Sequence, residues 1–320
     1  MAQLYDMPLE ELRKYKPKFT KEPDFEEFWS KSLRKLAEVP VKYELTPYDY
    51  PVKGVKVFRV SFLGFENANI DGWFAIPDKE GLHPGLVLYH GYNWAYEGCI
   101  HDVVNWALNG YAVMNMLVRG QQGNSVDNIV SSTGCAAGWM GKGILNPDEY
   151  YFRAVYMDAV RAVEVLASMP QVDESRIGVT GGSQGGALTL ATAALSNIPK
   201  VAAADYPYLA NFERAIDVTP EGPYLELNEF FRRYSRPEIE IQAKKTLSYF
   251  DNMNLASWIK CKTWICVGLV DQITPPSTIF AVYNHLTCPK NITIFRYFGH
   301  EDIPGYVETK LRLLMDELNP

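Results

Sequence analysis

"GVTGGSQGGALTL" occupies residues 178–190 and joins an apolar run to a helix-like run through Gly-Gly-Ser-Gln-Gly-Gly. A serine hydroxyl is a weak nucleophile, so it needs a neighbouring base and must project from the scaffold. A strained turn from a strand into a helix presents serine in this way, and it favours glycine two residues before and two residues after. Gly181, Ser183 and Gly185 have that spacing. The stretch therefore predicts a strand over 176–182, a helix over 186–197 and a nucleophile at Ser183.

A glycine-rich turn that opens a helix is also typical of phosphate-binding loops. The spacing G-x-G-x-x-G is absent from this stretch, and no Walker lysine follows the glycines. The strand that precedes the turn also comes late in the chain, whereas dinucleotide loops follow a first strand. These features favour the nucleophile over the phosphate loop.

The chain on both sides of this turn alternates between strand-like and helix-like segments. Apolar runs predict strands over residues 85–91, 111–120, 201–207, 262–271 and 291–300, and amphipathic runs predict helices over 101–110, 148–169 and 304–318. Such alternation indicates right-handed crossovers and an α/β fold, with a mostly parallel, twisted central sheet and helices on both faces. Functional residues then lie just past the carboxyl ends of the strands.

Three segments depart from the alternation. Residues 1–80 are interpreted as an extension, with a helix over 23–39 and a hairpin made of the runs 55–64 and 69–78. Residues 121–147 are predicted to form a long loop, and residues 208–260 a helical insertion between late strands. Insertions at the functional edge of a sheet usually shape a site. We expect one domain over residues 1–320.

Composition narrows the classes of function. The chain has 320 residues, 47% of them hydrophobic, and a formal net charge of −7, which argues against nucleic acid as a partner. Its beginning has no apolar signal-peptide core, and no apolar run is long enough to span a membrane, so we expect a cytoplasmic protein. The five cysteines include no C-x-x-C pair, which predicts free thiols. No metal or cofactor is expected.

A serine nucleophile on this turn needs a histidine base later in the chain. Only His285 and His300 follow Ser183. His285 lies in a helical run and is interpreted as a packed or surface residue. His300 follows the last predicted strand, after a turn at Gly299, and is predicted to be the general base.

An acid must then orient the imidazole. Asp271 ends the apolar run "TWICVGLV" and is the preferred candidate. Asp205 ends the run "VAAAD" and is the alternative, although its strand lies next to the nucleophile strand and therefore farther from the last strand. Either aspartate could instead cap a turn.

The oxyanion of an acyl-transfer reaction needs two backbone donors. The N–H of Gln184, which follows the nucleophile, is one candidate. The N–H of Tyr92, after the run ending in "HG", is the other. His90 is interpreted as a buttress of that loop. Arg119 either binds substrate or, the preferred interpretation, ties down loop carbonyls.

The motifs "RGQ" (119–121), "GGSQG" (181–185) and "HE" (300–301), in this order, resemble the signature of carbohydrate esterase family seven. This family contains acetyl xylan esterases and cephalosporin C deacetylases. The resemblance covers nearly the whole chain. It includes "LYDMPLEEL" (4–12), "HGYN" (90–93), "GWM" with "KGIL" (138–145) and "VGLVDQITPPST" (267–278), and is strongest to the bacillar cephalosporin C deacetylases.

This resemblance implies an α/β-hydrolase fold and a cytoplasmic serine esterase without cofactor. The implied substrates are short acetylated xylo-oligosaccharides and cephalosporin C, and the implied assembly is a homohexamer, a trimer of dimers. Residues carried over by motif are the triad and the two oxyanion donors already named. By similarity, the substrate pocket is expected to be lined by Tyr92, Tyr208, Pro223 and Ile273. The loop 124–137 departs from the family pattern.

Other readings are a general short-chain carboxylesterase, a serine peptidase of the prolyl oligopeptidase type, and a hydrolase fold that has lost catalysis and serves as a scaffold. The peptidases carry a further domain, for which 320 residues leave no room. The presence of all the triad residue types argues against the scaffold.

Overall fold

The computed structural model describes residues 5–93, 100–133 and 138–320. Within them the strands form one mixed sheet of nine strands in the order β1-β2-β3-β5-β4-β6-β7-β8-β9. The six strands β5-β4-β6-β7-β8-β9 are parallel to one another. The pairs β1-β2, β2-β3 and β3-β5 are antiparallel. The strands are β1 (Tyr43–Pro47), β2 (Val55–Leu63), β3 (Asn69–Pro77), β4 (His83–Tyr89), β5 (Ala112–Met116), β6 (Val172–Gly182), β7 (Val201–Asp205), β8 (Lys262–Gly268) and β9 (Lys290–Phe295).

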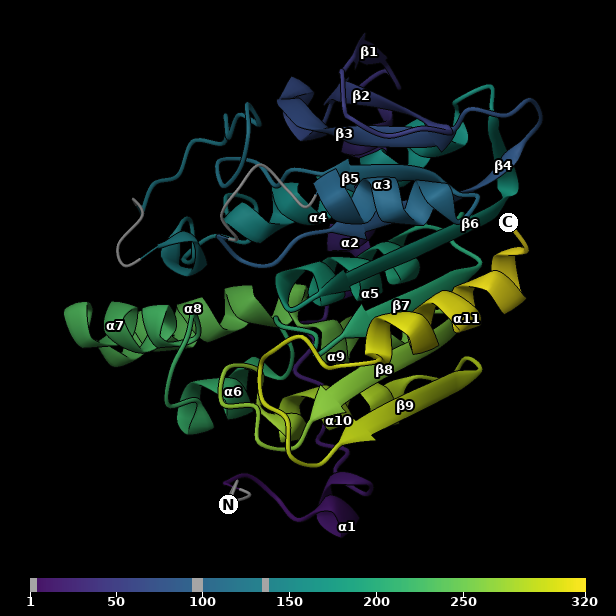
Figure 1. The fold of residues 1–320 in the computed structure, drawn as a ribbon. Coiled ribbons are helices and arrows are strands. Elements are labelled where there is room, and N and C mark those ends of the chain that lie inside the picture. The colour runs from purple at the N-terminus through teal and green to yellow at the C-terminus, as the bar shows by residue number, and fades with distance from the viewer. Residues whose placement is uncertain (1–4, 94–99, 134–137) are drawn as a thin grey trace.

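Helices cover both faces of this sheet (Figure 1). Apolar residues of α3 and α11 pack in one cluster with one face, and those of α2, α4, α5 and α10 pack in a larger cluster on the other face. The helices are α1 (Leu9–Leu12), α2 (Phe25–Ala37), α3 (Ile100–Leu108), α4 (Tyr151–Ala167), α5 (Gln184–Leu195), α6 (Phe212–Val218), α7 (Leu225–Arg233), α8 (Pro237–Phe250), α9 (Asn252–Leu255), α10 (Pro276–His285) and α11 (Tyr306–Leu318).

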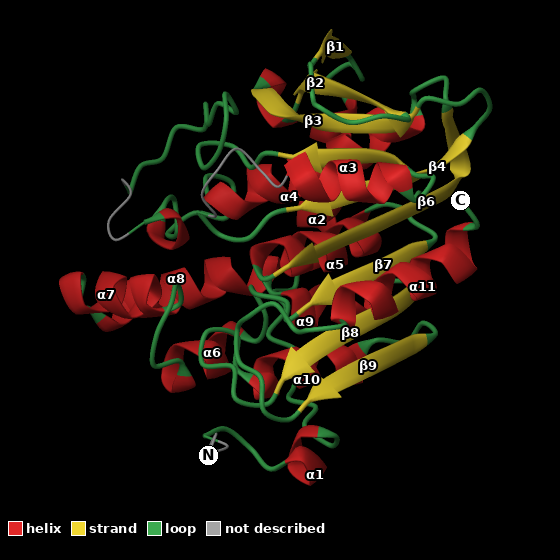
Figure 2. Cartoon of the chain, viewed as in Figure 1, coloured by secondary structure: helices red, strands yellow, loops and turns green. Residues whose placement is uncertain are grey.

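The expected α/β architecture is confirmed, and the predicted strands and helices lie within a few residues of the observed ones. The hairpin of β2 and β3 is confirmed, but sequence analysis missed β1 at the edge of the sheet. That strand is short, mostly exposed and ends in proline, so it lacks the apolar alternation that marks a strand. Helices α6 to α9 form the expected insertion between β7 and β8, and α7 and α8 project from the body of the molecule (Figure 2).

Two expectations from composition have a structural counterpart. Cys261, Cys266 and Cys288 are free thiols, whereas Cys99 and Cys135 lie outside the described residues. Among the helices that the structure describes, none combines the length and apolar character required to cross a bilayer. The loop 124–137 is described only as far as residue 133.

Candidate active site

Ser183 occupies the turn between β6 and α5 with a left-handed backbone, φ 57° and ψ −117°. A non-glycine residue rarely adopts this conformation, which places strain at the residue predicted to react. Neighbouring backbone holds the turn in place. The Ser183 N–H donates to the carbonyl of Asp205 at 3.0 Å, and the Ser183 carbonyl accepts from the N–H of Tyr208 at 2.9 Å. Asp205 is the last residue of the neighbouring parallel strand β7, and Tyr208 lies in the loop that follows it.

The glycines around Ser183 are a steric condition of this turn. A Cβ on Gly185 would lie 2.0 Å from the carbonyl oxygen of Tyr89, and one on Gly181 would lie 2.4 Å from the same oxygen. The Gly181 Cβ would also meet the backbone of Gly185 at 2.7 Å. Strand β4 therefore passes so close to the turn that no side chain can occupy either position.

Asp271 and His300 meet where the loops after β8 and β9 run together. The Val270 N–H donates to the carbonyl of Phe298 at 3.2 Å, which joins the two loops through their backbones. The Nδ1 of His300 lies 2.9 Å from Oδ2 of Asp271, which is fully buried. A carboxylate at Nδ1 holds that nitrogen protonated and leaves Nε2 free to accept a proton.

Further bonds fix the Asp271 carboxylate. Its Oδ1 accepts from the N–H groups of Ile273 and Thr274, and its Oδ2 accepts from the Thr274 hydroxyl at 2.7 Å. The ring of Tyr206 stands edge-on to the His300 ring, with 4.7 Å between centroids. The imidazole is thus oriented by a buried acceptor on one side and an aromatic wall on another.

Asp205, the alternative acid, has a different partner. Its Oδ2 accepts from the Lys310 ammonium on α11 at 2.5 Å. Asp205 therefore neutralises a lysine, while Asp271 is the aspartate bonded to His300. His285, on α10, is buried and its Nδ1 bonds to the carbonyl of Ala281 within the helix, in agreement with its interpretation as a packed residue.

His90 supports the loop that carries the predicted oxyanion donor Tyr92. Its Nε2 accepts from the N–H of Val118 at 2.9 Å, so its Nδ1 must be the protonated nitrogen that donates to the Gly91 carbonyl at 2.7 Å. Burial lowers the pKa of His90 from its usual 6.5 to about 4, and the bond to Gly91 opposes this shift only in part. His90 is therefore a neutral buttress, as expected, and no reactive base.

The side chain of Tyr92 is anchored by a carboxylate that sequence analysis did not identify. The Tyr92 hydroxyl bonds to both carboxylate oxygens of Glu226 on α7, at 2.9 and 2.8 Å, and accepts from the Trp139 N–H at 2.9 Å. Glu226 also accepts from the N–H of Met140. Burial raises the pKa of Glu226, and the bond from Tyr92 opposes the rise. The insertion thereby reaches back to the loop after β4.

Gln121 joins the two stretches of backbone predicted to donate to the oxyanion. Its Oε1 accepts from the Asn93 N–H at 3.0 Å, directly after Tyr92, and its amide exchanges two bonds with the side chain of Gln184, at 2.8 and 3.0 Å. The Gln184 N–H is at the start of α5, where amides have no helical acceptor and remain available to a ligand. The glutamine of "RGQ" therefore ties both loops together.

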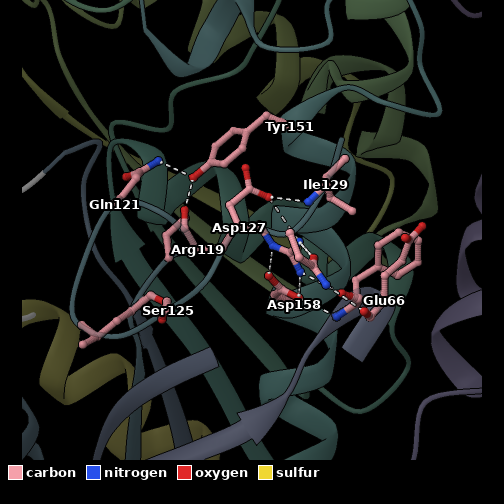
Figure 3. Close-up of polar contacts among 12 residues, drawn as sticks. Glu66, Arg119, Gln121, Ser125, Asp127, Ile129, Tyr151 and Asp158 are labelled. Atoms are coloured by element: carbon pink, nitrogen blue, oxygen red, sulfur yellow. Dashed lines mark hydrogen bonds and ion pairs between the residues drawn. The ribbon is translucent and has the colours of Figure 1, made fainter. Parts of the chain in front are cut away.

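Arg119, fully buried, has a structural position in the loop 119–129 (Figure 3). Its guanidinium makes two bonds to Asp158 on α4, at 2.6 and 2.8 Å, and one to the carbonyl of Phe65. Its own carbonyl accepts from the hydroxyl of Tyr151. The Tyr151 hydroxyl in turn accepts from Gln121, so hydrogen bonds connect Arg119 to the loops of Tyr92 and Gln184. This agrees with the interpretation of Arg119 as a residue that ties down the loop.

The predicted site residues converge on one cavity of about 350 Å³. Its lining includes five residues singled out from sequence: Tyr92, Ser183, Pro223, Ile273 and His300. Asp271 lies behind His300. The other two do not line it: Gln184 has a fully buried side chain, and Tyr208 is fully buried behind Tyr92, with 6.2 Å between ring centroids.

The N-terminal extension contacts the loop that carries Asp271. The Tyr5 hydroxyl donates to the Asp271 carbonyl at 2.5 Å. Asp6 accepts from the Ser277 N–H at the start of α10 and pairs with Arg214 on α6. Tyr5 and Asp6 of the motif "LYDMPLEEL" therefore support the acid loop from outside the sheet.

A serine on a strained turn, an imidazole held by a buried carboxylate and two candidate oxyanion amides form an arrangement suited to acyl transfer. The chain belongs to the acetyl xylan esterase family, because the model described as acetyl xylan esterase (AXE1) matches residues 1–317. The fold is that of an α/β-hydrolase.

Two solved structures are similar over nearly the whole chain. The acetyl xylan esterase from Paenibacillus sp. R4 is 40% identical with a TM-score of 0.94, covering 98% of this chain and 100% of that one. Acetyl xylan esterase 1 from Thermoanaerobacterium sp. JW/SL YS485 is 34% identical with a TM-score of 0.93, covering 98% and 99%. The acetyl esterase Axe7A of Xylanibacter ruminicola is 28% identical over 285 residues, which is 86% of this chain but 63% of that relative's length.

Proposed function

We propose that this protein is a serine esterase that removes acetyl groups from small esters through a covalent acetyl-enzyme. The observation that carries the proposal is the strained turn at Ser183, which opens into the same cavity as His300, with Asp271 bonded behind the imidazole. Family membership and the names of the similar structures support the same chemistry.

In the first half-reaction, Nε2 of His300 takes the proton of the Ser183 hydroxyl while Oγ attacks the acetyl carbonyl carbon. The N–H groups of Gln184 and Tyr92 stabilise the oxyanion that develops. Collapse of the tetrahedral intermediate breaks the bond to the alcohol oxygen, which receives the proton from His300. Asp271 stabilises the imidazolium and remains ionised.

In the second half-reaction, His300 takes a proton from water, and the resulting hydroxide attacks the acetyl carbonyl. A second tetrahedral intermediate then releases acetate, and the proton returns from His300 to Ser183. The same two amides stabilise both intermediates, so each contributes to both steps.

The acyl side of the cavity has walls that restrict its width. Pro223 and Ile273 line the cavity together with Tyr92, and a Cβ on Gly222 would lie 2.9 Å from the Ile273 side chain, so this wall is tightly packed. Tyr208, whose ring centroid lies 6.2 Å from that of Tyr92, is expected to support this wall from behind. We infer a preference for acetyl over longer acyl groups.

The proposed substrates are short acetylated xylo-oligosaccharides and cephalosporin C, whose acetylated ends a cavity of about 350 Å³ can receive. The resemblance to carbohydrate esterases supports these substrates. On the same resemblance we propose that the chain forms a single domain and assembles into a cytoplasmic homohexamer. The alternative is a general short-chain carboxylesterase or a peptidase-like hydrolase that shares the catalytic residues.

Two measurements test the proposal. Ser183→Ala should lower kcat on p-nitrophenyl acetate by about 10⁴–10⁶-fold, and near wild-type activity would reject Ser183 as the nucleophile. A panel of p-nitrophenyl esters of increasing acyl length should show a steep fall in kcat/KM beyond acetyl. A preference for butyryl or longer chains would favour the general carboxylesterase.

A further inference from the structure

The active-site cavity continues beyond the acyl walls, over the sheet and between α3 and α11. We name this part the α3–α11 arm and define it by Leu88, Trp106, Asn115, Thr180 and Lys310, all of which line the cavity. Leu88 on β4 pairs in register with Asn115 on β5 and with Thr180 on β6. These three residues form a floor across three adjacent strands, and Trp106 on α3 and Lys310 on α11 form the walls.

The volume of the cavity exceeds the needs of an acetyl group. About 350 Å³ corresponds to the lower end of small-molecule sites, roughly 300–1,000 Å³. The reaction requires room for a second component, the alcohol that leaves. This room is sufficient for about one ring beside the acetyl group.

Asn115 offers a buried hydrogen-bond acceptor to a ligand in the arm. Its Nδ2 donates to the carbonyl of Leu88 at 3.1 Å, which fixes the side-chain amide against the floor. Its Oδ1 is buried and, among the residues described by the structure, has no hydrogen-bond partner. A buried carbonyl oxygen without a donor costs free energy that a ligand hydroxyl would recover.

The charged groups of the arm disfavour an anionic ligand. Lys310 is paired with Asp205, so its positive charge is compensated inside the protein. Asp102, Glu301 and Asp302 line the rest of the cavity and are exposed at its opening. The aromatic ring of Trp106 supplies an apolar wall beside these acceptors, a combination suited to a ring that carries hydroxyl groups.

We propose that the α3–α11 arm binds the ring of the alcohol that is nearest the ester, as an uncharged ring bearing hydroxyl groups, with Asn115 accepting from one hydroxyl. Of the two proposed substrates, this favours the acetylated xylo-oligosaccharides over the anionic cephalosporin C. This inference rests on the proposed esterase function. It names the part of the molecule that selects the leaving group, whereas the walls at Pro223 and Ile273 select the acyl group.

The first test fills the arm. Leu88→Phe extends the floor toward Trp106, and Leu82→Phe makes the same change at an exposed position just before β4. We compare kcat/KM for monoacetylated xylose with kcat/KM for methyl acetate, whose alcohol is too small to reach the arm. Leu88→Phe should lower the ratio of xylose ester to methyl ester by about tenfold or more, and Leu82→Phe should leave it unchanged.

The outcomes separate the two proposals. An unchanged ratio in folded Leu88→Phe, whether both rates fall together or neither falls, would overturn the arm as the alcohol subsite. Failure of the wild-type protein to cleave either ester would instead overturn the proposed esterase function.

The second test keeps the arm open and changes its charge, so it does not depend on Leu88→Phe folding. Asp102→Lys lies at the opening, and Asp316→Lys makes the same change on an exposed part of α11 that does not line the cavity. The probes are acetylsalicylate and phenyl acetate, which share a ring and differ by one carboxylate. Asp102→Lys should raise the ratio of acetylsalicylate to phenyl acetate by about threefold, and Asp316→Lys should not. If Asp102→Lys and Asp316→Lys changed this ratio equally, the result would contradict binding of the leaving group in the α3–α11 arm.

Discussion

The turn at Ser183 and the loop at Tyr92 lie side by side at the carboxyl end of the sheet, but the protein holds them by different means. The turn is fixed by backbone: glycines at 181 and 185 let β4 approach, and β7 supplies the hydrogen bonds. The loop is fixed by side-chain contacts to distant segments. His90, within the loop, accepts from the N–H of Val118 after β5, while Gln121 after β5 and Glu226 in the insertion bond to Asn93 and Tyr92.

This difference predicts how each region responds to substitution. Backbone packing around the turn has no tolerance, because a carbonyl oxygen of a central strand cannot move away. Side-chain support of the loop is shared among several residues, so the loss of one should misplace Tyr92 in part and leave the fold intact.

The largest effect is expected from Gly185→Val. Its Cβ would lie 2.0 Å from the Tyr89 carbonyl oxygen, so we expect loss of folding, or a destabilisation above about 4 kcal/mol with loss of activity even though Ser183, Asp271 and His300 are intact. Gly299→Ala is the control, because its Cβ would have its nearest contact at an ordinary 3.5 Å. Thermal unfolding of both variants checks this, and equal stability would remove the steric argument.

A smaller effect is expected from protonation of His90. Its pKa is about 4 when folded and 6.5 ordinarily, so the unfolded chain takes up a proton first and stability is lost as pH falls from 6.5 toward 4. At pH 5 the loss amounts to about 2 kcal/mol relative to pH 7. His90→Gln cannot titrate, so its unfolding free energy by urea should fall by about 2 kcal/mol less than that of wild type. The same pH dependence in both proteins would show that His90 is not the cause.

Glu226→Gln tests the side-chain support of Tyr92. An amide keeps one acceptor but cannot accept from both Tyr92 and Met140 with the strength of a carboxylate. We expect kcat on p-nitrophenyl acetate to fall about tenfold with KM little changed, less than the 10²–10³-fold of a lost oxyanion donor. Glu229→Gln, one turn further along α7, where the carboxylate pairs with Arg233 and not with Tyr92, is the control. A rise in KM alone would point to substrate contact in place of positioning.

The smallest effect is expected from Tyr5→Phe, which removes the hydroxyl that donates to the Asp271 carbonyl. One hydrogen bond contributes about 0.5–1.5 kcal/mol, so the melting temperature should fall by a few degrees at most. Tyr297→Phe, at an exposed ring, should have no effect. A fall in kcat without a matching fall in melting temperature would show that the N-terminal segment positions the Asp271 carboxylate.

The same contrast explains how much could be predicted from sequence. The α/β architecture follows from local patterns, since most strands and helices have a hydrophobic periodicity of their own, and the exposed edge strand β1 is an exception. The sequence predicts the turn at Ser183 because Gly181 and Gly185 lie two residues before and after it. It predicts Asp271 and His300 because each follows a predicted strand in the chain order expected for a triad.

Glu226 could not be found in this way. It is one acidic residue among many in the insertion, and its partner Tyr92 is 134 positions away in the chain. Tyr208 illustrates the reverse case, because motif similarity put it in the pocket wall whereas packing places it behind Tyr92. Contacts between side chains of distant segments depend on the packed fold, which periodicity does not specify.

The most direct test of the account is to trap the acetyl-enzyme. Wild-type protein is mixed with p-nitrophenyl acetate, quenched in acid within the first turnovers and digested for peptide mass spectrometry. We predict an acetyl group on Ser183, absent from Ser183→Ala. Acetylation of another residue during turnover, or hydrolysis that continues in Ser183→Ala, would contradict the assignment of Ser183 as the nucleophile.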